Sequence, residues 1–283
     1  MSNNAPPHPC FCLGLGMQSR RQINYNMTHG LQSMNQDEQA TIDVAVNDQL
    51  ILVCGYSATG KSASLRNIRN QERWLYLNTE AGKRLPFRNK FQSYRIEDPL
   101  QVHEAFDYAT DNPDVDGIIL DSLTFLMDMY ESQYVLNSAN TMKAWGEFSQ
   151  FFKVLMQEKI TRFGKPVIVT AHVLDVLDEK AMEVKTSVPI KGSLKNNGIE
   201  AYFSTVVGTK KMSIKDLKDY QSDLLTVTEE DQELGFKYVF QTRLTQKTTG
   251  ERIRSPMGMF SKKETFTDND CQVLLDHLHS FYN

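Results

Sequence analysis

Continuous apolar runs, rather than alternating ones, dominate the middle of the chain. Each run is followed directly by a glycine or a polar residue. Runs of this length between turn residues predict strands that are buried on both faces, as in a parallel sheet. The three clearest runs cover residues 50–54, 118–120 and 167–171, the last with Thr170 as its one polar residue.

Apolar residues at helical spacing fill the stretches between these runs. The expected helices cover residues 62–70, 99–111, 123–134, 142–162 and 269–281. Two further strands are expected at residues 73–77 and 93–96. Strands that alternate with helices predict an α/β fold, with a mostly parallel, twisted sheet flanked by helices.

The C-terminal part of the chain is more fragmented. We expect a long, lysine-rich loop over residues 174–197 and a charged surface helix over residues 211–221. Strands are expected over residues 201–208, 224–228 and 237–244, and residues 248–251 have the composition of a hairpin turn. The pattern therefore predicts hairpins and a closing helix over residues 212–283.

The first 41 residues are rich in Ser, Asn, Pro and Gln and lack periodicity. Such a segment cannot bury enough apolar surface to offset the entropy of ordering, so we expect a disordered extension. Residues 42–46 alternate and predict a short strand. One domain is therefore expected over 42–283.

The most specific motif follows the first apolar run. Residues 55–62 read G-Y-S-A-T-G-K-S, the pattern of a phosphate-binding P-loop. Gly55 and Gly60 allow a turn whose N–H groups face one concavity, and a helix start behind it favours anions. Lys61 would reach the β- and γ-phosphates of ATP, and the Ser62 hydroxyl would bind Mg²⁺. The alternative is a glycine turn with an exposed lysine.

We expect the whole P-loop run to line the nucleotide site. Its members are Gly55, Tyr56, Ser57, Ala58, Thr59, Gly60, Lys61, Ser62 and Ala63.

Polar residues also end the other predicted strands. Asp121 ends an apolar strand in the Walker B pattern, where a carboxylate holds Mg²⁺. Glu80 follows the second strand, and His172 ends the strand after the long helix. The carboxyl ends of parallel strands share one edge of a sheet, so these three should meet Gly55 there. The alternatives are a helix-capping Asp121, a solvated Glu80 and an ordinary edge histidine.

Composition excludes some classes of partner. The 283 residues carry a formal net charge of -4, which gives no overall basic signature of nucleic-acid binding, although single loops can still be basic. No apolar run reaches the length of a membrane helix. Four scattered cysteines favour a reducing, cytoplasmic compartment, and Cys10-Phe11-Cys12 lacks the second pair that a zinc site needs.

Two of these positions point to a known family. Ser122 rather than glutamate follows Asp121, which argues against the AAA+ and helicase classes that place a base there. Glu80 instead occupies the position of the catalytic glutamate of RecA-fold ATPases. Residues 49–211 resemble the RecA core, and residues 192–204 resemble the end of its second DNA-binding loop. Within that fold the chain resembles small phage-type RecA-like ATPases of recombination and single-strand annealing (the Sak-type group).

This resemblance implies roles for individual residues. Glu80 would orient and deprotonate the attacking water, with Lys61 on the phosphates and Ser62 and Asp121 on Mg²⁺. His172 would sense the γ-phosphate, in the place of the glutamine of RecA itself. Lysines of the following loop would contact DNA or a neighbour's phosphate, and a neighbouring subunit would supply a cationic finger.

The loop candidates are Lys191 and Lys195, and the finger candidates are Arg243, Lys247, Arg252 and Arg254. Solvated loop lysines are the alternative for the first two.

The resemblance thus implies an oligomeric, Mg²⁺-dependent ATPase acting on single-stranded DNA in recombination, annealing or repair. A single-strand-binding protein is a further expected partner, and the cytoplasm of a bacterial host is the expected location if a phage encodes the chain. The alternative is a P-loop ATPase that acts as a regulatory switch or partner-loading factor without binding DNA. A small-molecule kinase is a third reading, but the sequence has no arginine-rich lid.

Overall fold

The computed structural model describes residues 47–283, apart from 181 and 197. The expected N-terminal extension and the expected strand at residues 42–46 lie outside this part of the chain.

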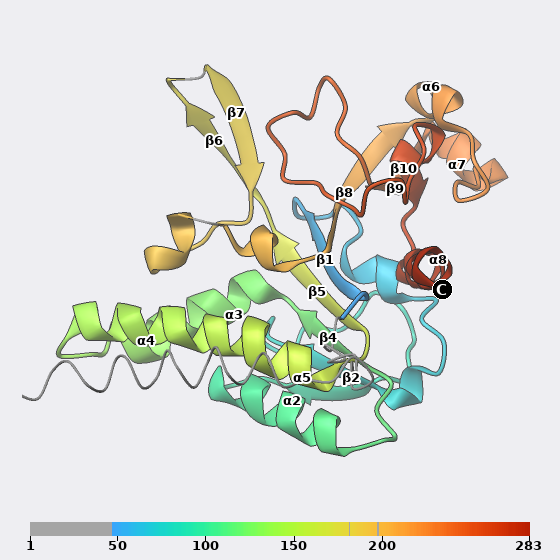
Figure 1. Cartoon of the computed structure of the whole chain (residues 1–283). Coiled ribbons are helices and arrows are strands. Elements are labelled where there is room, and N and C mark those ends of the chain that lie inside the picture. Colours follow the sequence, from blue (N-terminus) through green and yellow to red (C-terminus); the bar gives the residue numbers. More distant parts are fainter. Residues whose placement is uncertain (1–46, 181, 197) are drawn as a thin grey trace, which may run out of the picture. The chain divides into compact units, whose positions relative to one another are not determined.

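An eight-stranded sheet, in the order β10-β9-β8-β1-β5-β4-β2-β3, forms the centre of the described chain (Figure 1). Its strands are β1 (Leu50–Gly55), β2 (Trp74–Asn78), β3 (Gln92–Arg95), β4 (Gly117–Asp121), β5 (Val167–His172), β8 (Thr205–Ser213), β9 (Phe236–Gln241) and β10 (Phe266–Asp268). Neighbours from β3 to β8 in this order pair parallel, whereas β9 and β10 are added antiparallel at one edge. The predicted α/β class with a mostly parallel sheet is confirmed.

The continuous apolar runs are central strands, as predicted. Every residue of β1, β2 and β4 is buried. Along β1, Leu52 packs into one hydrophobic cluster, while Ile51 and Val53 pack into another on the opposite face of the sheet. A strand that is covered on both faces needs apolar residues at every position, which explains the absence of alternation.

Helices supply both of these clusters. Side chains of α2 (Leu100–Asp111), α3 (Leu123–Tyr130), α4 (Thr141–Val154) and α5 (Ile160–Phe163) join the cluster of Leu52, and those of α8 (Cys271–Tyr282) join the cluster of Ile51. Short π-helical turns at Glu131–Val135 and Leu155–Lys159 continue α3 and α4. No helix of the described chain combines the length and apolarity needed to cross a membrane.

The helix predicted after the P-loop is wrong in length. A single 3₁₀ turn, η1 (Ser62–Leu65), replaces the expected helix over residues 62–70, and turns follow it. Backbone groups that a longer helix would pair internally bond elsewhere; the Arg69 N–H, for example, donates to Gln272 Oε1 at 2.9 Å. Sequence periodicity cannot detect a partner 203 residues away.

The predicted loop over residues 174–197 is also wrong. It contains a hairpin of β6 (Leu174–Asp178) and β7 (Glu183–Ser187), followed by the 3₁₀ turns Gly192–Asn196 and Ile199–Tyr202. Every residue of both hairpin strands is exposed or half-buried, so the hairpin has no buried face that would impose a clear alternation.

The C-terminal elements differ in detail from the prediction. Strand β8 continues to Ser213, where a helix had been expected from residue 211, and residues 224–228 form no strand. The short helix α6 (Ile214–Leu217) lies within the helix predicted over residues 211–221 but is much shorter. The helix α7 (Glu229–Leu234) and strand β10 were not predicted, and residues 248–251 turn without forming a hairpin of two named strands. The remaining 3₁₀ turns are Gln71–Arg73, Lys218–Tyr220 and Lys263–Thr265.

Candidate functional site: a P-loop pocket

The P-loop joins β1 to η1, and its backbone depends on two glycines. A Cβ atom on Gly55 would lie 2.1 Å from Thr209 Oγ1, so no larger residue fits there. Gly60 has a φ of +95°, which residues with a side chain rarely adopt. The Thr59 hydroxyl donates to the Tyr56 carbonyl at 2.7 Å and closes the turn. The concave loop is therefore built into the chain before any ligand arrives.

Lys61 lies folded back over this loop. Its ammonium group donates to the carbonyls of Gly55 and Tyr56, at 3.0 and 2.8 Å, and lies 3.4 Å from His172 Nδ1. Burial lowers the pKa of Lys61 to about 8, against the opposing effect of nearby carboxylates. A cation that has lost much of its hydration and makes no ion pair at salt-bridge distance among the described residues is well prepared to bind a phosphate.

Asp121, at the end of β4, receives three hydroxyl groups. Ser62 Oγ donates to it at 3.1 Å, Tyr76 Oη donates at 2.7 Å, and the Thr170 hydroxyl donates as well. Burial and the Asp121 carboxylate raise the pKa of Tyr76, which keeps that phenol a donor. Within the described residues, no N–H of the following helix donates to Asp121, and Ser122 occupies the N-cap position of that helix.

The paired oxygens of Ser62 and Asp121 have the chemistry of a Mg²⁺ site. Mg²⁺ prefers hard oxygen ligands, and it commonly takes one or two from the protein and the rest from phosphate and water. Within the described residues there is no group of three or more His, Cys, Asp or Glu side chains that could hold a metal ion without such help. The residues present thus fit a cation that arrives with a nucleotide.

Glu80 and His172 form a second pair beside Lys61. Glu80 Oε1 lies 3.6 Å from His172 Nε2, and Glu80 Oε2 accepts from Lys83 Nζ at 2.8 Å. The contact with His172 and the Lys83 charge lower the pKa of Glu80 to about 2, although burial acts in the opposite direction. The His172 ring also meets the edge of the Phe125 ring, with centroids 5.7 Å apart, and its backbone N–H donates to Thr124 Oγ1. Glu80 is therefore an anchored carboxylate, not a freely solvated one.

A pocket of about 220 Å³ unites these groups at the carboxyl ends of the strands. Its lining includes the five predicted residues with chemical roles, namely Lys61, Ser62, Glu80, Asp121 and His172. Ser57, Ala58, Gly60 and Ala63 line it as well. Of the nine P-loop residues expected here, Gly55, Tyr56 and Thr59 are not in the lining, and the Tyr56 hydroxyl donates instead to Asp175 of β6, at 2.5 Å.

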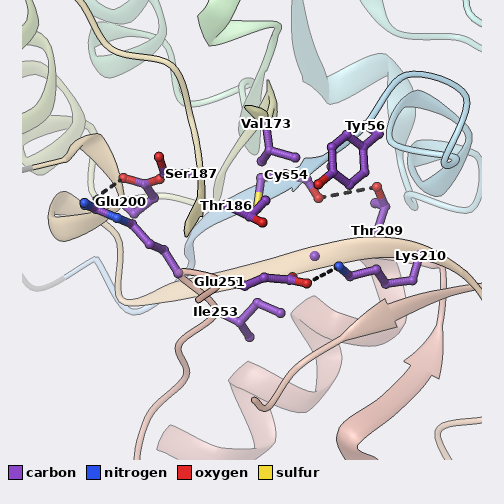
Figure 2. Close-up of a pocket in the computed structure, with 13 residues that line it drawn as sticks. Cys54, Tyr56, Val173, Thr186, Ser187, Glu200, Thr209, Lys210, Glu251 and Ile253 are labelled. Atoms are coloured by element: carbon purple, nitrogen blue, oxygen red, sulfur yellow. Dashed lines mark hydrogen bonds and ion pairs between the residues drawn. The ribbon is translucent and has the colours of Figure 1, made fainter. Parts of the chain in front are cut away.

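A second pocket lies between the carboxyl end of β1 and the middle of β8 (Figure 2). Two ion pairs border it, Lys210 with Glu251 at 2.5 Å and Arg252 with Glu200 at 3.5 Å. Gly55 and Tyr56 of the P-loop line this pocket, but Lys61, Ser62, Glu80, Asp121 and His172 do not, so we assign the chemistry to the first pocket. Arg252, a predicted finger residue, thus has a carboxylate partner within its own chain.

The other predicted cations are spread over the surface. Lys191 contacts the carboxylates of Asp128 and Glu131, and Arg243 donates to a backbone carbonyl, that of Phe260. Lys195 is exposed and lines, with Arg252, a groove of about 710 Å³ beside the β6–β7 hairpin. Lys247 and Arg254 are exposed. None of the six lines the phosphate pocket.

Four residues of the site were missed by the sequence reasoning. Tyr76 and Thr170 hold Asp121, and Lys83 and Arg84 line the phosphate pocket. Thr170 could have been found, because it lies two positions before His172 on a strand and so shares its face. Lys83, three residues after Glu80, carried a weaker signal, and Tyr76 within an apolar run carried none.

Comparison with known proteins adds a family match. A family model described as an AAA domain matches residues 47–249. Among solved structures, one described as the crystal structure of the RadB recombinase is 14% identical, with a TM-score of 0.33 over 58% of this chain and 74% of that chain. No curated protein matches the chain.

Proposed function

The chain belongs to the AAA domain family and has the α/β fold of a RecA-like P-loop NTPase, and we propose on that basis that it binds and hydrolyses ATP with Mg²⁺ and acts on single-stranded DNA. The observation that carries the ATPase proposal is the meeting of Lys61, Ser62, Asp121, Glu80 and His172 around one pocket. The P-loop and the ends of three other strands contribute them, at the sheet edge where open α/β folds bind their ligands.

Each side chain would perform one task in hydrolysis. Lys61 exchanges its contacts with the loop carbonyls for the β- and γ-phosphates. Glu80 positions the attacking water and accepts its proton. His172 lies close to both Lys61 and Glu80, at 3.4 Å from Lys61 Nζ and 3.6 Å from Glu80 Oε1. It would contact the γ-phosphate and so distinguish ATP from ADP.

The metal would be held by the chain's own oxygens. Ser62 Oγ would contact it directly, while Asp121 would bind it or its water, with Tyr76 and Thr170 fixing the carboxylate. Bound Mg²⁺ supplies neutralisation of the charge that develops on the phosphates. Lys83 and Arg84 line the same pocket and would add positive charge near the phosphates. In oligomers of RecA-like proteins, a cation from a neighbouring subunit has a comparable effect.

Single-stranded DNA is the proposed target because of the RecA resemblance and one surface feature. Lys195 is exposed in the groove beside the β6–β7 hairpin, which begins two positions after His172, so a backbone phosphate bound there would contact the element that follows the proposed nucleotide sensor. The chain would act as an oligomer, in which a neighbour's cation completes the pocket, since none of the candidate finger residues reaches the pocket of its own chain.

The hairpin also favours a second candidate function, a switch or partner-loading ATPase that does not bind DNA. Its exposed side chains include several large apolar ones, and its described charged residues are more acidic than basic. The apolar ones are Leu174, Val176, Leu177, Met182 and Val184. The charged ones are Asp175, Asp178, Glu179, Lys180, Glu183 and Lys185. A protein partner suits such a surface better than a phosphate backbone does.

Hydrolysis measurements with and without single-stranded DNA test both candidates. We expect wild-type protein to hydrolyse ATP faster with DNA than without it. Lys61→Ala should lose hydrolysis both with and without DNA. Lys215→Ala, which removes an exposed lysine on α6, is the control and should behave as wild type. Filter binding over a salt series, with Lys195→Ala beside the same control, tests the DNA contact. If the rate of hydrolysis is the same with and without DNA, and the protein does not bind DNA at low salt, the second candidate function, a switch or partner-loading ATPase, is favoured. Absence of nucleotide binding and hydrolysis in the wild type would refute the ATPase itself.

A further inference from the structure

The chain segment after the P-loop is held from outside rather than by its own helix. The helical segment directly after Lys61 is η1, a 3₁₀ turn of four residues. Residues 60–69 instead contact the start of α8 and the residues before it, and in Figure 1 α8 lies beside this segment. Two stretches about 200 residues apart in sequence therefore build one structural unit.

Six contacts join the two stretches. They are Gly60 to Asn269 at 2.9 Å, Ser64 to Cys271 at 3.1 Å, Arg66 to the Asn269 carbonyl at 3.1 Å, Asn67 to Asp270, Arg69 N–H to Gln272 at 2.9 Å, and Arg69 to Asp276.

Among these contacts, that of Asn269 reaches the P-loop itself. Asn269 is 4% exposed, and its Nδ2 donates to the carbonyl oxygen of Gly60. A Cβ atom on Gly60 would lie 2.5 Å from Asn269 Nδ2, so the two residues are in close contact. The orientation of the amide is fixed by chemistry, because a carbonyl oxygen can only accept and must therefore face the NH₂ group.

The direction of the Gly60 carbonyl controls a phosphate-binding group. The Gly60 carbonyl and the Lys61 N–H belong to one planar trans peptide, so they point in opposite directions. Holding the carbonyl toward Asn269, and toward the Ser64 N–H that donates to it at 3.0 Å, directs the Lys61 N–H away from α8. That N–H is one of those with which a P-loop surrounds phosphate.

We propose that Asn269 is a positioning residue for nucleotide binding, which fixes the Gly60–Lys61 peptide from the C-terminal part of the chain. The inference rests on the proposed ATPase function and goes beyond it, since the P-loop motif contains nothing that points to residue 269. Asn269 does not touch the nucleotide; it acts through the peptide plane. Its Oδ1 atom is buried and has no hydrogen-bond partner within the described chain, so only the donor end is in use.

The variant Asn269→Asp tests this with little change of shape. At neutral pH it places a carboxylate oxygen against the Gly60 carbonyl, where a donor is needed. We expect the dissociation constant for a fluorescent ATP analogue to rise about tenfold, as loss of one buried hydrogen bond plus repulsion implies. Because ground state and transition state lose the same contact, KM should rise while kcat stays within about twofold. Asn269→Ala, which only removes the donor, should show a smaller rise in the same direction.

The control is His277→Ala on the same helix. His277 Nε2 contacts the Met259 carbonyl at 2.9 Å and its ring stacks on Phe260, away from the P-loop segment. This variant should lower the melting temperature yet leave the dissociation constant unchanged. If the wild type and Asn269→Asp bind the analogue equally well, the inference about Asn269 is overturned, while the proposed function stands. A wild type that does not bind the analogue would overturn the proposed function with it.

Discussion

Replacement of Glu80 by glutamine separates catalysis from binding at this site. Glutamine has nearly the same shape and can keep a contact with His172 or Lys83, but it cannot accept a proton. Glu80 lies 3.6 Å from His172 and 2.8 Å from Lys83, whereas Lys61 donates to the carbonyls of Gly55 and Tyr56 and makes no hydrogen bond to Glu80 among the described residues. We therefore expect the affinity for ATP to change by less than about threefold while turnover falls.

The size of the fall follows from the environment of the carboxylate. A general base contributes about 10² to 10⁴ in rate, and its effect grows with its basicity. A pKa of about 2 makes Glu80 a weak base, so its main contribution is to orient the water. We expect kcat to fall about 10²- to 10³-fold in Glu80→Gln, which corresponds to about 2.7–4 kcal/mol in activation free energy.

Steady-state phosphate release and equilibrium binding of an ATP analogue measure the two quantities. Glu97→Gln is the matched control, because Glu97 is an exposed carboxylate that pairs with Arg95 at 3.2 Å outside the phosphate pocket. The same pKa implies that Glu80 stays ionised above about pH 3, so its protonation should not limit kcat between pH 5 and 8. A Glu80→Gln enzyme that keeps kcat within threefold of wild type would refute the assignment of Glu80 as the group that acts on water.

Two further predictions concern other parts of the pocket. Burial lowers the pKa of Lys61 to about 8, so the ammonium loses its charge as pH rises through that value. The dissociation constant for ATP should therefore rise above pH 8, by up to about tenfold per pH unit. A dissociation constant that stays the same from pH 7 to 9.5 would contradict this prediction. Tyr76→Phe removes a buried donor to Asp121 and should lower the free energy of unfolding by about 1.5–3 kcal/mol in urea denaturation. Tyr108→Phe, at a 51% exposed phenol, should cost less than about 0.5 kcal/mol, and equal costs for both would disprove a special role of Tyr76.

The parts of the site that follow from sequence are those fixed by local pattern. Continuous apolar runs are incompatible with exposed strands, so β1, β4 and β5 had to be central. Parallel pairing then brings their ends together, and the register Gly55 with His172 does so directly. The spacing of Gly55 and Gly60 before Lys61 then identifies the turn that follows β1 as a phosphate-binding loop. Chemistry at a strand end is therefore predictable when both the strand and its ending residue are recognisable.

The parts that do not follow are those fixed by partners distant in sequence. Residues 62–70 have helical composition, yet contacts with residues 269–276 decide their conformation. Lys191 looked like a free loop cation, but it meets Asp128 and Glu131 from α3 and the turn after it. The β6–β7 hairpin depends on pairing across an exposed turn with no buried face. A sequence lists each of these groups without saying which other group it will meet.

The hairpin is also the point at which the nucleotide pocket connects to the surface. His172 ends β5, and β6 begins at Leu174, so a single residue separates the proposed γ-phosphate sensor from the hairpin. A second connection runs from Tyr56 of the P-loop to Asp175, which also accepts from Thr186 of β7 at 2.6 Å. An isolated two-stranded hairpin is marginally stable, so a partner that covers it would shift its position or its order. Such a partner, whether DNA or protein, would act on the P-loop through both connections and change the affinity for nucleotide. Thermodynamic linkage then requires that nucleotide binding change the affinity for the partner by the same factor.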